Sequence, residues 1–387
     1  MADRLEDTLD LLQRLVAYPT VSADSNLEMI ADLATRLGEV GARVELFRDE
    51  SGHKANLFAT LGPEGDGGLI LSGHTDVVPA EEEYWSSDPF ALHERDGRVY
   101  GRGTCDMKGF IAAATVMARE YAQLPLKRPL HFAFTYDEEV GCLGARALVP
   151  ELQKRGLKPA MAIIGEPTMM RVIEGHKGCC EYTVRFAGLA GHGSAPERGV
   201  NAAEYAVRYV SHLMGLRGDL MMRAPKNSRF DPPWTTINIG GLNAGVAHNV
   251  IAGWAEVAWE MRPVQKADQD FVKKAIETYV ERDLLPAMRS IHPASAIETE
   301  VIGEVSGMEI MDENEARDLV TGLVGANGAD VVPFGTEAGL FQEMGMSVAV
   351  CGPGSIDQAH KPDEYLSLDQ LSGCLTMLEG LGRKLTA

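Results

Sequence analysis

The sequence is short of positive charge and has no basic stripe. Its 387 residues include 36 lysines and arginines against 56 aspartates and glutamates, which gives a formal net charge of −20. Proteins that bind nucleic acids neutralise phosphates with clustered cationic side chains, and the lysines and arginines do not cluster here. The composition therefore argues against a nucleic-acid partner and suits an acidic cytoplasmic enzyme.

The sequence also lacks the cysteine pattern of a disulfide-stabilised protein. Its six cysteines form no CxxC pair and no closely spaced framework. Such a pattern is typical of reduced thiols in a cytoplasmic protein. We therefore expect no disulfide.

Long hydrophobic runs are missing as well. The longest, FIAAATVMA at residues 110–118, has nine residues, and a membrane-spanning helix needs ~20. The N-terminus, MADRLEDTLDLLQRL, spaces its apolar residues as a helix does and places acidic residues between them, unlike a signal peptide. We expect no membrane segment and a first helix at the N-terminus of the mature protein.

Between residues 40 and 175 the sequence alternates short β-rich runs with helical patterns. The strand-like runs are ARVELF, ANLFATL, GLILSG, LHFAFTY and AMAIIGE, and helices are expected at 109–122 and 143–154. This alternation predicts an α/β domain with a largely parallel sheet that is covered on both faces. Ligands of such sheets bind beyond the carboxyl ends of the strands.

The middle of the chain has the order β-α-β-β-α-β, which predicts a ferredoxin-like α+β unit with two helices on one face of a four-stranded sheet. Its strands are expected at 179–188, 234–245, 252–263 and 296–305, and its helices at 200–214 and 268–289. The rest of the chain returns to the first pattern and ends in a helix at 368–385. We therefore predict that residues 178–305 are inserted into an α/β domain formed by residues 1–177 and 306–387.

Metal-capable side chains follow the ends of several expected strands. Each lies within a turn or loop after an apolar run: His74, Asp106, Glu138 with Glu139, Glu166 and His360. One such residue alone is usually a solvated loop residue or a helix cap. In a parallel sheet, however, these strand ends meet at one edge, where so many carboxylates are costly to bury without a cation. The pattern predicts two divalent metal ions.

The ligand types assign roles within this group. Imidazole and carboxylate together favour zinc, with manganese or cobalt as substitutes. Two ions about 3.5–4 Å apart share a bridging carboxylate and leave a position for water, and Asp106, short and flanked by glycines, is the expected bridge. Glu138 and Glu139 are adjacent, so one is expected to ligate and the other to act as a base, unless they form a solvated acidic turn. Asp76, two residues after His74, is expected to orient its ring.

The motifs SGHTDVVP, GRGTCDMKG, DEEVG and GEPT and the late histidine resemble those of the two-metal amidohydrolases. This family includes acetylornithine deacetylase, succinyl-diaminopimelate desuccinylase, the aminoacylases and carboxypeptidase G. The resemblance covers nearly the whole chain and implies a di-zinc aminopeptidase-like catalytic domain with an inserted dimerisation or lid domain. It implies one metal ion on His74, Asp106 and Glu166, another on Asp106, Glu139 and His360, Glu138 as general base, and Asp76 as the carboxylate that orients the histidine.

The same resemblance implies substrate contacts in the inserted domain of a homodimer. His192 matches a histidine that reaches the active site of the partner subunit, although Gly193 stands where this branch usually has serine. Asn249 and Arg262 match positions that hold the substrate backbone or carboxylate, and a guanidinium suits the second task. Without the resemblance, Arg262 is equally well a surface residue at a strand end.

Two late segments, FGTEAGLFQ and CGPGSIDQAHKPDEYL, most resemble the acetylornithine deacetylase branch. Desuccinylases typically have serine where Glu337 stands, and a carboxylate there would pair with the ammonium of ornithine; alternatively, Glu337 caps the following helix. The expected reaction is hydrolysis of N2-acetyl-L-ornithine to L-ornithine and acetate, a step of arginine biosynthesis. The alternatives are a broader N-acyl amino acid deacylase, a desuccinylase, a dipeptidase, or a metal-free binding homologue without activity.

Overall fold

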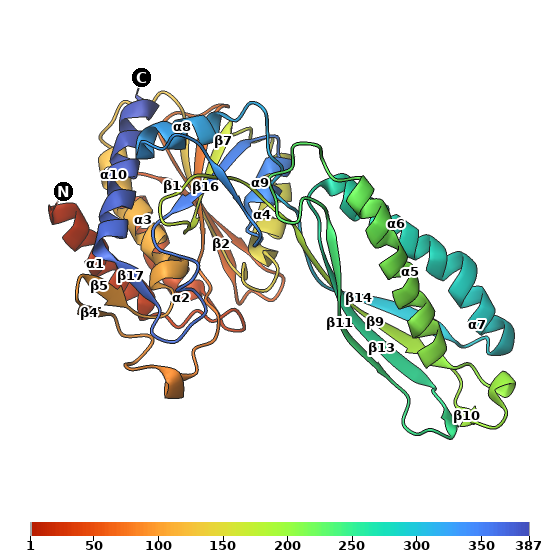
Figure 1. Ribbon diagram of the computed structural model, residues 1–387. Helices are drawn as coiled ribbons and strands as arrows, with labels where there is room; N and C mark the ends of the chain where they lie inside the picture. The colour runs from red at the N-terminus through yellow and green to blue at the C-terminus, as the bar shows by residue number, and fades with distance from the viewer. Residues whose placement is uncertain (1, 387) are drawn as a thin grey trace. The chain divides into compact units, whose positions relative to one another are not determined.

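A computed structural model describes residues 2–386 and divides the chain into two compact units (Figure 1). The first unit comprises Met1–Gly175, Ile310–Val331 and Thr336–Ala387. The second comprises His176–Glu309 and Val332–Gly335. Each unit has a hydrophobic core of its own, and the first is assembled from both ends of the chain.

An eight-stranded mixed sheet forms the centre of the first unit. In spatial order its strands are β1 (Arg43–Arg48), β2 (Ala55–Leu61), β6 (Leu130–Thr135), β3 (Leu69–His74), β7 (Met161–Pro167), β16 (Ser347–Gly352), β8 (Ile173–His176) and β15 (Asp330–Val332). The central strands β6, β3, β7 and β16 run parallel, whereas β1, β2 and β8 pair antiparallel with their neighbours. The predicted α/β fold with a mostly parallel central sheet is confirmed.

Helices cover both faces of this sheet (Figure 1). On one face lie α1 (Ala2–Val16), α2 (Leu27–Glu39), α3 (Gly109–Tyr121), α8 (Glu315–Val324) and α10 (Leu368–Leu385), and on the other lie α4 (Leu143–Lys154) and α9 (Ala338–Glu343). α3 packs between the sheet and the outer helices α1 and α10, and it is almost wholly buried. Its alanines 112–114 allow this close approach because they carry little side-chain volume.

A small sheet brings the late part of the chain beside the early part. It consists of β4 (His93–Arg95), β5 (Arg98–Tyr100) and β17 (Tyr365–Ser367), in the order β17-β5-β4. β17 pairs antiparallel with β5, so that Tyr365 lies opposite Tyr100. The segment before β17 is thereby held next to the loop that leads from β5 into α3.

The second unit is a four-stranded antiparallel sheet with helices on one face (Figure 1). The strands, in the spatial order β11-β13-β9-β14, are β11 (Thr236–Ala244), β13 (Trp254–Arg262), β9 (Cys179–Ala187) and β14 (Ala296–Val305). The helices are α5 (Ala202–Met222), α6 (Lys266–Tyr279) and α7 (Leu285–Ile291), and a two-residue ladder joins β10 (Gly191–His192) to β12 (Val250–Ile251). The order of elements is β-α-β-β-α-β, as the sequence predicts.

Two helices of this unit differ from their expected extents. α5 continues to Met222 rather than ending near residue 214, because Leu216 and Leu220 are buried and offset the cost of two glycines in that stretch. The helix expected over 268–289 is divided by a wide turn at Val280–Leu284. Pro286 explains the division, since it has no N–H to donate to the carbonyl four residues earlier.

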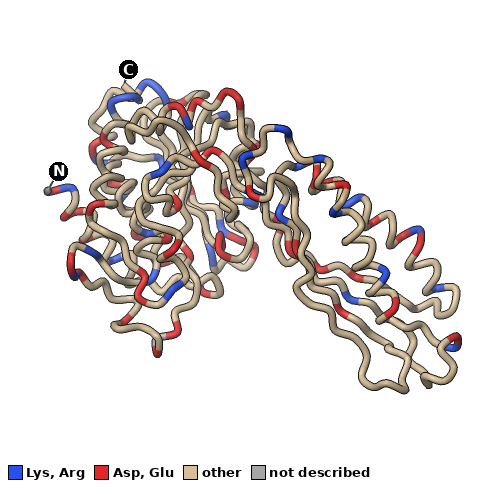
Figure 2. The backbone as a smooth tube through the Cα atoms, viewed as in Figure 1, with Lys and Arg blue, Asp and Glu red and all other residues tan. Residues whose placement is uncertain are grey.

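The surface carries charges of both signs. Acidic and basic residues are interspersed along the backbone of both units, as the tube in Figure 2 shows. Among residues 2–386, no helix combines the length and the apolar character that crossing a membrane requires.

Burial of His131 on β6 predicts that stability falls in acid. The ring is 2% exposed, stacks on Phe58 and places Nδ1 2.8 Å from Thr60 Oγ1. Burial lowers the pKa of His131 from its ordinary 6.5 to about 4. Between these values only the unfolded chain takes up the proton, so the free energy of unfolding falls with falling pH, by on the order of 1.4 kcal/mol per pH unit for this group. Above pH 6.5 the group contributes no slope.

The check is urea unfolding of the metal-stripped protein at several pH values between 4.5 and 7.5. In His131→Phe, the free energy of unfolding should depend on pH less steeply than in the wild type, whatever its absolute value. Equal slopes in the two proteins would show that His131 takes up its proton at the same pH in the folded and unfolded states, and so that burial does not lower its pKa.

Candidate metal centre

The predicted ligands lie at one edge of the parallel sheet. His74 is the last residue of β3, Glu166 lies near the end of β7, and Glu138 and Glu139 follow β6. His360 lies in the loop after β16. These are the four adjacent parallel strands, so their carboxyl ends bring all five side chains to the same place.

Asp106 enters this cluster from the turn Thr104–Lys108, between β5 and α3. Its two carboxylate oxygens contact different histidines. Oδ1 lies 2.9 Å from Nε2 of His74, and Oδ2 lies 3.4 Å from Nε2 of His360. A carboxylate shared in this way between two imidazoles is placed as a bridge requires.

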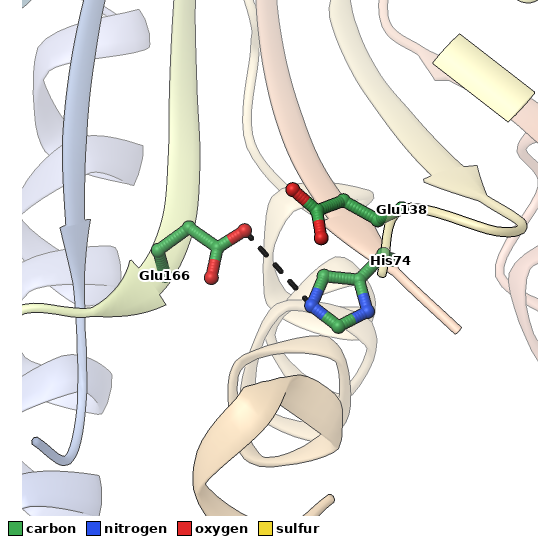
Figure 3. A group of neighbouring side chains, drawn as sticks. All are labelled: His74, Glu138 and Glu166. Carbon is green, nitrogen blue, oxygen red and sulfur yellow. Dashed lines mark ion pairs between the residues drawn. The ribbon is translucent and has the colours of Figure 1, made fainter. Parts of the chain in front are cut away.

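The remaining carboxylates surround the two histidines. Glu139 Oε2 lies 2.9 Å from His360 Nε2, and Glu166 Oε1 lies 3.9 Å from His74 Nε2. Glu166 and Glu138 both point toward the His74 ring (Figure 3). Within this cluster, two three-residue groups have ligand atoms within 4.8 Å of one another, namely His74 with Glu138 and Glu166, and His74 with Asp106 and Glu139.

Asp76 holds the turn after β6 as well as approaching His74. Its carboxylate Oδ1 lies 3.6 Å from His74 Nδ1, while the backbone carbonyl of Asp76 is closer to that nitrogen, at 2.9 Å. The carboxylate accepts hydrogen bonds from the backbone N–H groups of Glu138, at 3.0 Å, and Glu139, at 3.3 Å. Ser22 donates a third, at 2.7 Å. Asp76 thus joins His74 to the two adjacent glutamates.

The pKa values of the cluster show an excess of negative charge. Burial raises the pKa of Glu166 well above its usual range, and the charge of Asp106 adds to the shift. Desolvation, with the charges of Glu139 and Asp106, raises the pKa of Glu138 to about 8. Burial lowers the pKa of His74, but the hydrogen bonds with Asp106 and Asp76 outweigh it and leave that pKa well above its usual value. Hydrogen bonds with Asp106 and Glu139 raise the pKa of His360 to about 10.

The residues fit divalent cations. Glu166 Oε1 is buried and accepts no hydrogen bond from the described residues, and its ion pair with His74 Nε2 is long, at 3.9 Å, so a lone pair remains available to a cation. Two imidazoles with several carboxylates are the donor set of zinc, and also of manganese and cobalt. The bound protons that the raised pKa values indicate would give way to metal ions, because ligands bind a metal in their deprotonated form.

The predicted substrate residues His192, Asn249 and Arg262 lie in the second unit. His192 and Asn249 are neighbours, because Gly193 N–H donates to the Asn249 carbonyl at 2.7 Å. Both are exposed. Arg262 lies at the far end of β13, where its guanidinium pairs with Glu260 at 2.7 Å.

Glu337 lies in the first unit, immediately before α9, and is 1% exposed. Ser72 and Thr135 donate hydrogen bonds to its two carboxylate oxygens, at 2.6 and 2.8 Å. Its side chain makes no hydrogen bond to the start of α9, so the capping alternative is wrong. The carboxylate instead joins β3 and β6 just before the residues of the cluster.

Several residues that support the cluster were not predicted from the sequence. Cys142 lies with Sγ 3.4 Å from Glu138 Oε1, and Lys108, fully buried, donates to the backbone carbonyls of Leu15 and Tyr18. Glu364 accepts from the backbone of the Asp106 turn. The only sequence signal for these residues is their position inside or just after a metal-ligand motif, which does not reveal which side chains turn inward.

A cluster of histidines and carboxylates beyond the carboxyl ends of a parallel sheet is typical of α/β proteins that bind divalent metal ions. The sequence profile described as peptidase family M20/M25/M40 matches residues 70–384. The chain belongs to this family.

Two relatives are similar over nearly their whole length. The acetylornithine deacetylase of Edwardsiella ictaluri (strain 93-146) is 37% identical over 388 residues, covering 98% of each chain. The acetylornithine deacetylase of Shigella sonnei (strain Ss046) is 35% identical over 373 residues, covering 95% of this chain and 94% of the relative. These matches confirm the resemblance that the motifs indicate.

Solved structures confirm the fold. The M20 family metallo-carboxypeptidase Sso-CP2 from Sulfolobus solfataricus superposes with a TM-score of 0.74 at 17% identity, covering 98% of this chain and 99% of that one. The YXEP protein of Bacillus subtilis, a dinuclear metal binding peptidase of the M20 family, has a TM-score of 0.66 at 17% identity and covers 99% of both chains.

Proposed function

We propose that the protein is a two-zinc deacetylase that hydrolyses N2-acetyl-L-ornithine to L-ornithine and acetate in the cytoplasm, as a step of arginine biosynthesis. One observation carries the metal part of the proposal: the two oxygens of Asp106 contact two different histidines. The acetylornithine deacetylases at 35–37% identity support the substrate. Cobalt or manganese could replace zinc, because both accept the same ligands.

The proposed ligand sets share Asp106. His74 and Glu166 complete one set, and Glu139 and His360 complete the other. In support, Glu166 Oε1 has no donor in the described part of the chain, and His360 contacts both Asp106 and Glu139. Asp76 keeps the two sets in register through its contacts with His74 and with the backbone of the turn that carries Glu139.

Glu138 is the proposed general base. Two divalent ions held in the centre would orient and acidify a water molecule. Glu138 would take a proton from that water as it attacks the amide carbonyl, and would then deliver the proton to the departing amine nitrogen. Burial and the neighbouring carboxylates raise the pKa of Glu138 in the metal-free chain, and two bound cations would lower it again, which would leave Glu138 ionised and able to accept the proton.

A second chain is proposed to complete the site. β13 runs over nine residues from Trp254 to Arg262, and His192 and Asn249 lie beyond the Trp254 end of that strand. Eight steps along a strand span roughly 27 Å, much more than one N-acyl amino acid. One copy of the second unit therefore cannot place His192 and Arg262 on the same substrate molecule. We assign Arg262 to the substrate carboxylate in its own chain, and the oxyanion and substrate backbone to His192 of the partner subunit and Asn249 of the partner subunit.

The second unit offers a surface for the proposed homodimer. On α5, Val207, Met214 and Met221 are 56%, 51% and 51% exposed, and their spacing of seven residues places them on one face. β11, beside this helix, is an edge strand of its sheet, and edge strands can pair with a strand of another chain. An apolar helix face next to an open sheet edge suits association with a second copy.

The substrate assignment predicts a marked preference for a cationic side chain. N2-acetyl-L-ornithine should be hydrolysed with a kcat/KM about 10- to 100-fold above that for N-acetyl-L-norvaline, which has the same carbon chain without the amine. The measurement is steady-state hydrolysis of both compounds, and of N2-succinyl-L-ornithine, by zinc-loaded protein. Glu337→Gln tests whether this buried carboxylate, which accepts hydrogen bonds from Ser72 and Thr135, also attracts the ammonium, because the preference should then fall in the variant.

Each other outcome selects an alternative. Equal rates on the ornithine and norvaline compounds would indicate a broader N-acyl amino acid deacylase, and a faster succinyl substrate would indicate a desuccinylase. Activity on dipeptides alone would indicate a dipeptidase. A protein that takes up no zinc and hydrolyses none of these compounds would support the alternative of a binding homologue without activity.

A further inference from the structure

One buried carboxylate outside the cluster holds the turn that carries Asp106. Glu364, just before β17, is 1% exposed. Its Oε1 accepts hydrogen bonds from the backbone N–H groups of Cys105, at 2.9 Å, and Asp106, at 3.1 Å. Its Oε2 accepts from the backbone N–H of Gly103, at 3.0 Å, and from Nη1 of Arg102, at 2.7 Å. Four donors from five consecutive residues therefore converge on one side chain.

This convergence requires a carboxylate. Four donors share two acceptor oxygens, and a carboxylate offers acceptor lone pairs on both, whereas an amide offers them on one oxygen and would turn N–H groups toward two of the donors. The backbone of Glu364 takes part as well, since its carbonyl accepts from Gly101 N–H at 3.0 Å. Glu364 thus fixes the main chain around Asp106 through hydrogen bonds from both its side chain and its backbone.

The same residue belongs to the segment that carries His360. Only four positions separate His360 from Glu364, and a second contact joins the two segments where Cys105 Sγ lies 3.3 Å from the Ser355 carbonyl. The hydrogen bonds between Glu364 and the turn therefore fix the position of His360 relative to Asp106. These are the two residues whose side-chain atoms lie 3.4 Å apart in the cluster.

A purely structural ion pair is the competing interpretation. Arg102 is 3% exposed, and it donates to the Pro79 carbonyl at 3.2 Å as well as to Glu364. Breaking a buried pair is destabilising whichever partner is removed. The two partners differ in one respect: the carboxylate of Glu364 accepts from the backbone N–H of Asp106, and removing Arg102 leaves that bond in place.

We propose that Glu364 is a positioning residue of the metal centre, which sets the Asp106 carboxylate between His74 and His360. The proposal rests on the dinuclear centre proposed above. Loss of Glu364 should therefore weaken metal binding by more than the accompanying loss of stability explains.

The test is a Co²⁺ titration of metal-stripped protein, followed by visible absorption and by calorimetry, with melting temperatures measured in parallel. Glu364→Gln should bind Co²⁺ about 10- to 100-fold more weakly than wild type and change the absorption bands, because groups that orient metal ligands typically have effects of this size. Arg102→Met should lower the melting temperature but keep the wild-type bands. Glu174→Gln, which breaks the pair with Arg317 at 2.9 Å in the same unit, is the control for destabilisation alone.

Two results would overturn the proposal: wild-type affinity and bands in Glu364→Gln, or equal weakening in Arg102→Met, which would reduce the effect to the ion pair. If Glu364→Gln does not fold, Glu364→Asp, which keeps the charge and shortens the reach, serves in the same comparison. A wild-type protein that binds no Co²⁺ would instead refute the dinuclear centre itself, so the two failures are distinguishable.

Discussion

Glu138→Ala is expected to keep both metal ions and to lose about two to four orders of magnitude in kcat, the usual contribution of a general base. Glu138 points toward the His74 ring beside Glu166 (Figure 3), and Asp76 holds its backbone N–H at 3.0 Å. The proposed ligands do not include it, so the ions stay bound and the water stays oriented. Proton transfer fails, because no carboxylate remains at this position to take the proton.

Metal content and steady-state kinetics, measured on the same preparation, test this split of roles. Glu138→Asp provides the matched comparison, since it keeps a carboxylic acid but shortens the side chain by one methylene. Its kcat should lie between those of the wild type and Glu138→Ala. Loss of a metal ion in Glu138→Ala would make Glu138 a ligand, an arrangement that its closeness to His74 and Glu166 also permits. Retained turnover would remove Glu138 from the chemistry.

Mixing two inactive variants should restore activity, which is the second large effect that the proposal predicts. His192→Ala should lose about 10² to 10³ in kcat, the usual result of losing one donor to an oxyanion. A mixed dimer of His192→Ala with Glu138→Ala has one site with both groups intact: the first chain supplies Glu138 and the second supplies its histidine across the interface. Activity should return in up to one site per mixed dimer.

Subunit exchange must be shown first, by co-purification of differently tagged chains. If His192 served its own chain, every site in the mixture would lack one group, and mixing would restore nothing. Exchange without recovered activity would therefore contradict the assignment of His192 to the partner's site. The geometry of the second unit motivates the test, because β13 holds His192 and Arg262 apart by its whole length.

The cluster was predictable because its residues follow strands. A buried strand can be recognised in the sequence by a run of apolar side chains. Because β6, β3, β7 and β16 run parallel, the residues that follow each run lie at one edge of the sheet. His74, Glu139 and Glu166 could be placed together on this reasoning. The resemblance of the motifs supplied the specific ligand sets.

The supporting contacts were not predictable, because they join segments far apart in the chain. Glu364 and Asp106 are 258 positions apart, and Glu337 reaches Ser72 over 265. No local pattern of residues records such a pair. The position of Asp76 also depends on the folded turn: its carboxylate accepts from the Glu138 backbone at 3.0 Å but lies 3.6 Å from the His74 ring, so its second contact is visible only in three dimensions.

Metal content, measured by elemental analysis of protein purified without chelator, tests the central claim most directly. The wild type should hold two divalent ions per chain, and Asp106→Ala should hold fewer than one, because one carboxylate serves both ions. Glu174→Gln, in the same unit, should retain two. A wild-type protein without metal, or an Asp106→Ala variant that still binds two ions, would contradict a dinuclear centre bridged by Asp106.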